Sequence, residues 1–295
     1  MAGPDAADRE REQLNVFRTL PGIMAVRDAQ DLMAYPFFSL AKSKRLLPID
    51  FRAGEVALRV EGTVQHGLAT IWDADVLIWA ASQLIEARDG GIPTSRLLAA
   101  TPYEILTFIG RGTSARDYLR LRSALDRLQS TSVATSIRQA SIQRLHRFSW
   151  INEWTEHVDA RSRPLGLELV LPDWFYAGIV DASRVLTIDP AYFRLTGGIE
   201  RWLYRLVRKH AGRQIHGWRF DVRHLHRKSG SLARFADFAI DIRRIVADQA
   251  LPGYRLSIYR SRGDAETLLF QRVPATAPAR SLAALGAVHN PVGQS

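Results

Sequence analysis

The sequence has 295 residues, 46% of them hydrophobic, so the chain can bury a large core and its length suits two domains better than one. Without cysteine it has no disulfide, cysteine-ligated zinc or thiol nucleophile, and no apolar run approaches the roughly 18 residues of a membrane span, which favours a cytoplasmic protein without a membrane partner. The net charge is +10, and residues 201–260 hold fourteen Arg and Lys against four Asp, so one segment carries the excess and is expected to present it to a polyanion on one surface.

The predicted elements form two similar modules between two flexible ends. Residues 1–34 are polar and weakly patterned, and residues 273–295 end in PATAPARSLAALGAVHNPVGQS, so both segments are expected to be flexible, the second as a disordered tail. Between them, helical and strand periodicities follow in an order that repeats once. The repeat predicts a first domain over residues 35–182 and a second over residues 183–272.

In the first module, residues 75–88 are apolar on nearly all sides and predict a buried helix. A second helix follows, because residues 101–104 form a capping box with proline at the first helical position, and it ends before Gly110. Residues 114–117 repeat the capping pattern and open a third helix with leucines on one face and arginines on the other. This succession is typical of a helix-turn-helix.

The residues after the third helix alternate as strands do. Apolar side chains recur at every second position in 133–137, 148–150 and 165–171. A helix-turn-helix backed by antiparallel strands is the winged-helix arrangement. The predicted fold is therefore α+β, with two tandem winged-helix domains.

The second module opens with an amphipathic helix over residues 199–207, whose apolar residues follow i, i+3, i+4, i+7 spacing. Four basic residues are predicted to face away from its apolar side: Arg201, Arg205, Arg208 and Lys209. This module therefore also begins with a helix that packs on a core.

The rest of the second module repeats the first. A short helix over 222–226 and a turn over 228–231 precede a helix that is expected to bury Leu232 and to continue through Ile245. Residues 254–258 then alternate as the strand of a wing.

Candidate DNA contacts follow from this arrangement, because a major groove admits one helix whose first residues meet base edges. Base contacts are expected early in each third helix: Ser114 and Arg116 in the first module, Ser231 and Arg234 in the second. Phosphate contacts are expected from four nearby basic residues: Arg111, Arg120, Lys228 and Arg244. A solvated arginine face remains the alternative for either helix taken alone.

His224 and His226 match the His-hydrophobe-His pattern of metal-dependent nicking nucleases of the HUH type, with Tyr254 and Tyr259 downstream as candidate nucleophiles. Such ligands need a strand that points both imidazoles to one side, whereas this pair lies in a predicted helix and turn. The chain also lacks G-x-x-x-x-G-K-[ST], so no P-loop is predicted. We therefore expect no catalytic residue, metal ion or cofactor.

Asp73 and Asp75 precede a helix directly. They could form a carboxylate pair for metal-assisted hydrolysis, but an N-cap and a first-turn charge explain them more simply.

Several long strings resemble the replication initiator protein A family of bacterial plasmids. They are FFSLAKSKR (37–45), IWDADVLIWAASQL (71–84), FIGRGTSARDYLRLRSALDRLQST (108–131), LPDWFY (171–176), VLTIDPAYFRLTGGIERWLYRLVRKHAG (185–212) and LHRKSGS (225–231). The resemblance covers roughly residues 37–272 and is far more specific than a short motif.

The resemblance implies an initiator without catalytic activity, with two winged-helix domains. It would bind double-stranded plasmid origin DNA, help to open the duplex, and recruit the host helicase or its loader. A homodimer stays open, as do two other functions: a nicking endonuclease and a winged-helix transcriptional repressor.

Overall fold

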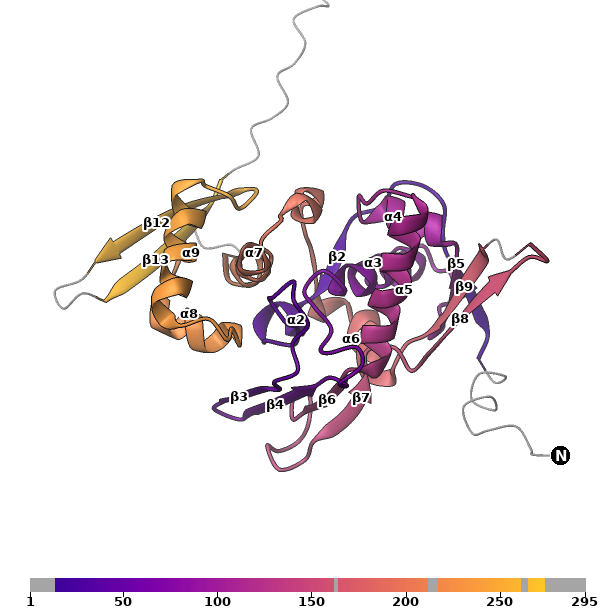
Figure 1. Cartoon of the computed structure of the whole chain (residues 1–295), viewed down its shortest axis with the longest axis horizontal. Helices are drawn as coiled ribbons and strands as arrows, with labels where there is room; N and C mark the ends of the chain where they lie inside the picture. Colours follow the sequence, from indigo (N-terminus) through magenta and orange to yellow (C-terminus); the bar gives the residue numbers. More distant parts are fainter. Residues whose placement is uncertain (1–13, 162–163, 212–216, 261–264, 274–295) are drawn as a thin grey trace, which may run out of the picture.

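The computed structural model describes residues 14–161, 164–211, 217–260 and 265–273, and Figure 1 shows two halves along its long axis. The first half contains β1 (Val16–Arg18), β2 (Arg27–Ala29), α2 (Gln30–Ala34), β3 (Ile49–Ala53), β4 (Val56–Glu61), α3 (Ala74–Asp89), β5 (Leu97–Ala100), α4 (Pro102–Phe108), α5 (Ala115–Ser130), β6 (Ser132–Thr135), β7 (His146–Ser149), β8 (Glu153–Val158), β9 (Pro164–Val170) and α6 (Asp173–Val180). A linking segment contains η1 (Ala182–Arg184), β10 (Val185–Thr187) and η2 (Pro190–Arg194). The second half contains α7 (Gly198–Ala211), β11 (Trp218–Asp221), α8 (Val222–Ser229), α9 (Phe235–Ala247), β12 (Tyr254–Arg260) and β13 (Glu266–Arg272).

Six elements form a compact unit in the first half: α3, β5, α4, α5, β8 and β9. The strand β9 lies in the middle of their antiparallel sheet, because it pairs with both β5 and β8. The helices α4 and α5 contact each other, and α5 also lies against β8. The short strand β1 extends the sheet by pairing in parallel with β5.

The second half repeats this unit. Its six elements are α7, β11, α8, α9, β12 and β13, and β13 lies between β11 and β12. Both units thus have the order helix, strand, helix, helix, strand, strand, with the first strand paired to the last. In Figure 1 the hairpins β12–β13 and β8–β9 project at opposite ends of the molecule.

A separate antiparallel sheet, in the order β3-β4-β6-β7, belongs to the first half alone. The strands expected at 133–137 and 148–150 lie here, as β6 and β7, and not beside the strand expected at 165–171, which is β9. Periodicity gives the buried face of each strand but not its partner, so the sequence could not separate the two sheets.

The two halves interlock at their junction. One hydrophobic core surrounds α3, and the other surrounds α7 and α9. The second core also takes Val26, Met33 and Ile78 from the first half, and β2 pairs antiparallel with β10. The fold is therefore a mixed α/β one in which chain segments cross between the units.

The flexible arm expected over residues 1–34 is wrong for residues 14–34, which contain β1, β2 and α2. Phe17 and Met33 are both buried there. These elements are only three to five residues long, too short for a periodicity to show, and they fold by pairing with distant strands. The tail expected over residues 273–295 lies outside the described residues, except for Val273.

Candidate nucleic-acid interface

The turn between α4 and α5 is built by the two capping boxes that the sequence predicts. Thr101 and Glu104 cap α4, and Gly110 follows its end at φ 66°. The Ser114 hydroxyl donates to Asp117 Oδ2 at 2.6 Å, while the backbone N–H of Asp117 donates back to Ser114 Oγ at 3.4 Å. The start of α5 is therefore fixed by its own side chains.

The solvent face of α5 carries the predicted basic residues. Arg116 and Arg120 are exposed, whereas the leucines of the opposite face are buried. Arg120 pairs with Asp117 at 3.2 Å, and Arg116 has no carboxylate partner among the described residues. Ser114 is exposed but its hydroxyl serves the cap, so Arg116 has the freest side chain of the set.

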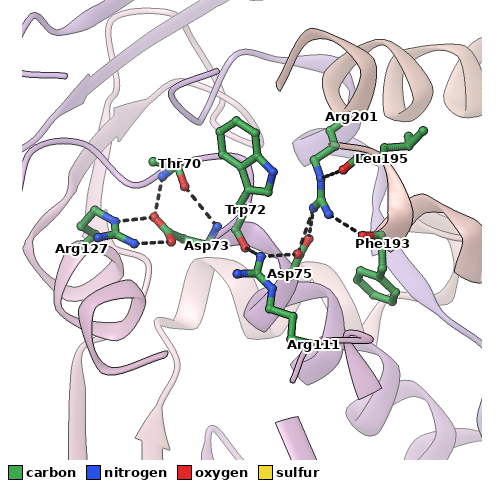
Figure 2. A network of polar contacts seen from close by, with 9 residues as sticks. All are labelled: Thr70, Trp72, Asp73, Asp75, Arg111, Arg127, Phe193, Leu195 and Arg201. Carbon is green, nitrogen blue, oxygen red and sulfur yellow. Dashed lines mark hydrogen bonds and ion pairs between the residues drawn. The ribbon is translucent and has the colours of Figure 1, made fainter. Parts of the chain in front are cut away.

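Arg127 anchors the far end of α5 to the start of α3 (Figure 2). Its guanidinium donates to both oxygens of Asp73, at 2.8 and 2.7 Å, and Asp73 also accepts from the backbone N–H of Thr70. The hydrogen bond to Asp73 raises the pKa of Arg127. Asp73 occupies the N-cap position of α3 but makes no side-chain cap hydrogen bond, so its role is to hold α5 and not the expected capping.

Asp75 ties the same turn to the second half (Figure 2). It is fully buried and accepts from Arg111 at 2.9 Å and from Arg201 at 2.8 and 2.9 Å. Arg201 also donates to the carbonyls of Leu195 and Phe193. Burial raises the pKa of Asp75, and the two guanidinium groups oppose that rise. Arg111, a predicted phosphate ligand, is thus already bonded on one edge.

A groove of about 990 Å³ runs beside α5. Its walls come from α5, from the loop before β3 and from the segment between β4 and α3: Lys42, Ser43, Lys44, Gln65, His66, Leu68, Thr70, Trp72, Asp73, Arg111, Arg116, Leu119, Arg120, Ser123 and Arg127. We call it the basic groove. Lys44 joins its two loops, because its ammonium donates to the carbonyls of Val64 and Gln65 at 2.8 and 3.1 Å. The one carboxylate in the lining, Asp73, is already paired, so the groove suits a polyanion.

The turn between α8 and α9 differs from the prediction. α8 runs to Ser229, and Gly230 ends it in the left-handed conformation at φ 62°. α9 begins only at Phe235, so Ser231 lies in the connecting turn, where its hydroxyl accepts from the backbone N–H of Ala233. Leu232, expected in the core, is 59% exposed. The glycine C-cap consumes the residues that the sequence pattern assigned to the helix.

The other predicted contacts of the second unit are mostly occupied. Lys228 lies in the last turn of α8, with its ammonium 5.1 Å from the ring centre of Tyr35 and 5.7 Å from that of Phe51. Burial lowers its pKa. Arg234 is 86% exposed and pairs with Asp237, and Arg244 pairs with Asp241. None of these three resembles Arg116, the free arginine of α5.

Two arginines expected on the outer face of α7 are buried instead. Arg201 is 3% exposed and pairs with Asp75; Arg205 is 1% exposed and donates to both oxygens of Asp28, at 2.7 and 2.9 Å. The expectation of one surface for the whole charge excess is wrong to that extent, because the first half covers this face of α7. The periodicity gave one apolar face and could not show that the other face meets a second domain.

His224 and His226 point apart on α8. The His224 ring stacks on Phe220, with ring centres 5.7 Å apart, whereas a ring nitrogen of His226 lies 2.8 Å from the carbonyl oxygen of Ala233. Within the described ranges, no group of three His, Asp or Glu side chains gathers as metal ligands. This pair is therefore not arranged as two ligands of one ion.

A third histidine, His210 at the end of α7, is half-buried between Trp218 and Phe220, with ring centres at 5.6 and 5.0 Å. Burial lowers its pKa to about 4, and the neighbouring Lys209, Lys228 and His224 add to the shift. The imidazole is consequently neutral at pH 7.

We expect the folded state to lose stability as the pH falls from about 6.5 toward 4. His210 titrates near pH 6.5 in the unfolded chain, so in this window the unfolded state binds more protons. Solvent screening of a half-buried group leaves about 1 kcal/mol between pH 7 and pH 5. Urea unfolding at both pH values should show a smaller difference for His210→Phe than for the wild type, and an equal difference would contradict the assignment.

Comparisons with known proteins agree with this architecture. The family model described as Replication initiator protein A matches residues 27–256. A protein of Wigglesworthia glossinidia brevipalpis that is named as a replication protein is 30% identical over 234 residues, which are 77% of this chain and 84% of the relative. Part of the site went unrecognised in the sequence: Lys42 and Lys44 lie in the string 37–45, but nothing local to them indicates that they face α5.

Crystal structures of domains 2 and 3 of RctB share the fold. One, of selenomethionine derivatives, has a TM-score of 0.61 over 82% of this chain and 98% of that chain; another has 0.55 over 83% and 97%. Both are 13% identical to this chain, so the likeness concerns the fold. Among the described residues, no helix has the length and apolar character to cross a lipid bilayer. Because the family match spans most of the sequence, the chain belongs to the replication initiator protein A family.

Proposed function

We propose that this protein is a plasmid replication initiator that binds double-stranded origin DNA sequence-specifically through two winged-helix units, and that it acts by binding and not by catalysis. The basic groove beside α5 carries the proposal. It places the unpaired Arg116 and the exposed Arg120 next to two lysine-bearing loops. A surface of this kind meets phosphates along one strand while the first turns of a helix meet base edges.

The repeated element order supports the winged-helix assignment. In each unit a helix and a strand precede the helix pair, and two strands follow it, with the first strand hydrogen-bonded to the last. The helix pairs α4–α5 and α8–α9 then occupy the place of the helix-turn-helix. Opening of the duplex and recruitment of the host helicase or its loader are part of the proposal, because the family is one of replication initiators.

Binding to origin DNA should depend steeply on salt, because each phosphate that is neutralised releases counterions. Fluorescence anisotropy with a duplex from the DNA that flanks the gene should give a log affinity that falls by about 0.9 per phosphate contact for each tenfold rise in salt. A scrambled duplex should bind more weakly at every salt concentration. Equal binding of both duplexes would contradict sequence-specific recognition.

The non-catalytic part of the proposal has a separate test. Supercoiled plasmid carrying the flanking DNA should stay intact when it is incubated with the protein and manganese. The divergence of His224 and His226 supports this outcome. A nicked plasmid with a covalent phosphotyrosine link to the protein would overturn it.

A further inference from the structure

The solvent face of α9 is apolar at its beginning. Leu232, just before the helix, and Ile240 are 59% and 58% exposed, and Ala236 between them is exposed as well. The opposite face of the helix fills the second core with Phe238 and Ile242. The three exposed residues therefore form an apolar stripe, Leu232–Ala236–Ile240, that contributes nothing to that core.

The charges on α9 are internally neutralised. Each of its arginines is held by a carboxylate: Arg234 by Asp237 at 2.9 Å, Arg243 by Glu266 at 2.9 Å and Arg244 by Asp241 at 2.7 Å. α5 differs, because it exposes Arg116 without a carboxylate partner among the described residues and has an extended basic groove beside it. The two helices hold the same place in their units but offer different chemistry.

Cations that are free to meet phosphates lie next to the stripe, on α8. Arg223 and Arg227 are exposed, and among the described residues neither has a carboxylate partner. The guanidinium of Arg223 lies 4.3 Å from the ring centre of Phe235, at the first turn of α9. In a helix-turn-helix the first helix crosses the phosphate backbone while the second enters the groove, so this division of charge fits a duplex.

The charge of the second unit also decides between occupants of the stripe. Residues 217–260 hold nine Arg and Lys against four Asp, so a second copy packed on this face would bring like charges together. A duplex instead offers anionic edges on both sides of a major groove, and the C5-methyl group of thymine is the apolar feature of that groove.

On the basis of the DNA-binding function proposed above, we infer that the stripe Leu232–Ala236–Ile240 contacts thymine methyl groups in the major groove. The second unit then prefers A·T pairs, whereas the arginines of α5 suit guanine. The protein accordingly recognises the two parts of its site by different means.

Replacing thymine with deoxyuridine tests this directly, because it removes the methyl group and leaves the base-pairing and charge of the duplex unchanged. We would first footprint the full-length protein on the flanking DNA, and then substitute each thymine of the protected site in turn. Wild-type affinity should fall about fourfold for each contacted thymine, the equivalent of about 0.8 kcal/mol for one buried methyl group. The double variant Leu232→Ala/Ile240→Ala should bind the thymine and uracil duplexes alike at those positions.

The matched control is Ile92→Ala, which truncates another exposed aliphatic residue, in the first half. It should keep the full response to deoxyuridine, and all variants should melt at the wild-type temperature because the truncated side chains are exposed. If the wild type binds its site and no thymine responds, or if the double variant keeps the response, the inference is overturned while the proposed function stands. Loss of self-association in the double variant, without a methyl effect, would likewise overturn it. Failure of the wild type to bind any duplex would refute the proposed function itself.

Discussion

Replacing Asp75 with alanine is expected to lower the free energy of unfolding by about 3 to 5 kcal/mol, the usual cost of leaving a buried charge without its partner. Asp75 is fully buried, and Arg201, its main partner, is 3% exposed. Once the carboxylate is gone, the Arg201 guanidinium cannot reach water without moving α7 away from α3. Arg111 is one-third exposed and can be rehydrated, so the effect comes mainly from Arg201. Urea unfolding followed by tryptophan fluorescence measures the change.

A second substitution separates the orphaned charge from other effects. In Asp75→Ala/Arg201→Met no charge is left in the interior, so part of the lost stability should return. Recovery should be incomplete, because the carbonyls of Phe193 and Leu195 lose their donor. Arg59→Ala breaks an exposed pair with Asp50 and should leave the unfolding curve in place. A wild-type curve for Asp75→Ala would show that this ion pair does not hold the halves together.

The features that the sequence predicts well are those that depend on neighbouring residues. The Ser114–Asp117 capping box is an example, because both partners lie within one turn and each satisfies a backbone group of the other. The buried helix α3 is another, since its apolar composition fixes its place without knowledge of its neighbours. The start of α9 was placed too early because the left-handed Gly230 leads into a longer turn than the pattern suggested.

Contacts between distant segments could not be predicted in the same way. Arg205 and Asp28 are 177 residues apart in the chain, yet their side chains form a buried pair at 2.7 Å. Lys42 and Lys44 reach the groove beside α5 only because two loops fold across it. An arginine-rich helix face looks the same in a sequence whether solvent, DNA or another domain covers it. Only the packing of the two halves distinguishes Arg205 from Arg116.

Substituting Arg116 and Arg120 together with alanine is expected to weaken binding to the origin duplex by about 1 to 3 kcal/mol for each arginine that reads a base. Both side chains are exposed at the start of α5 and line the basic groove. An arginine that only contacts phosphate should act differently: its loss lowers the salt slope by about 0.9 and weakens all duplexes alike. Anisotropy titrations with cognate and scrambled duplexes at several salt concentrations separate the two roles.

The matched control for this pair is Arg18→Ala, which removes an exposed positive charge from β1. If the basic groove is the DNA site, Arg18→Ala keeps the affinity, the salt slope and the preference for the cognate duplex, although its net charge changes as well. Arg127→Ala should weaken binding indirectly, because it frees α5 from Asp73, and its loss of binding should be accompanied by a lower melting temperature. The double variant keeps every anchor of α5 to the core, so its melting temperature should stay near that of the wild type. Normal binding by a folded Arg116→Ala/Arg120→Ala protein would place the DNA on another face of the molecule.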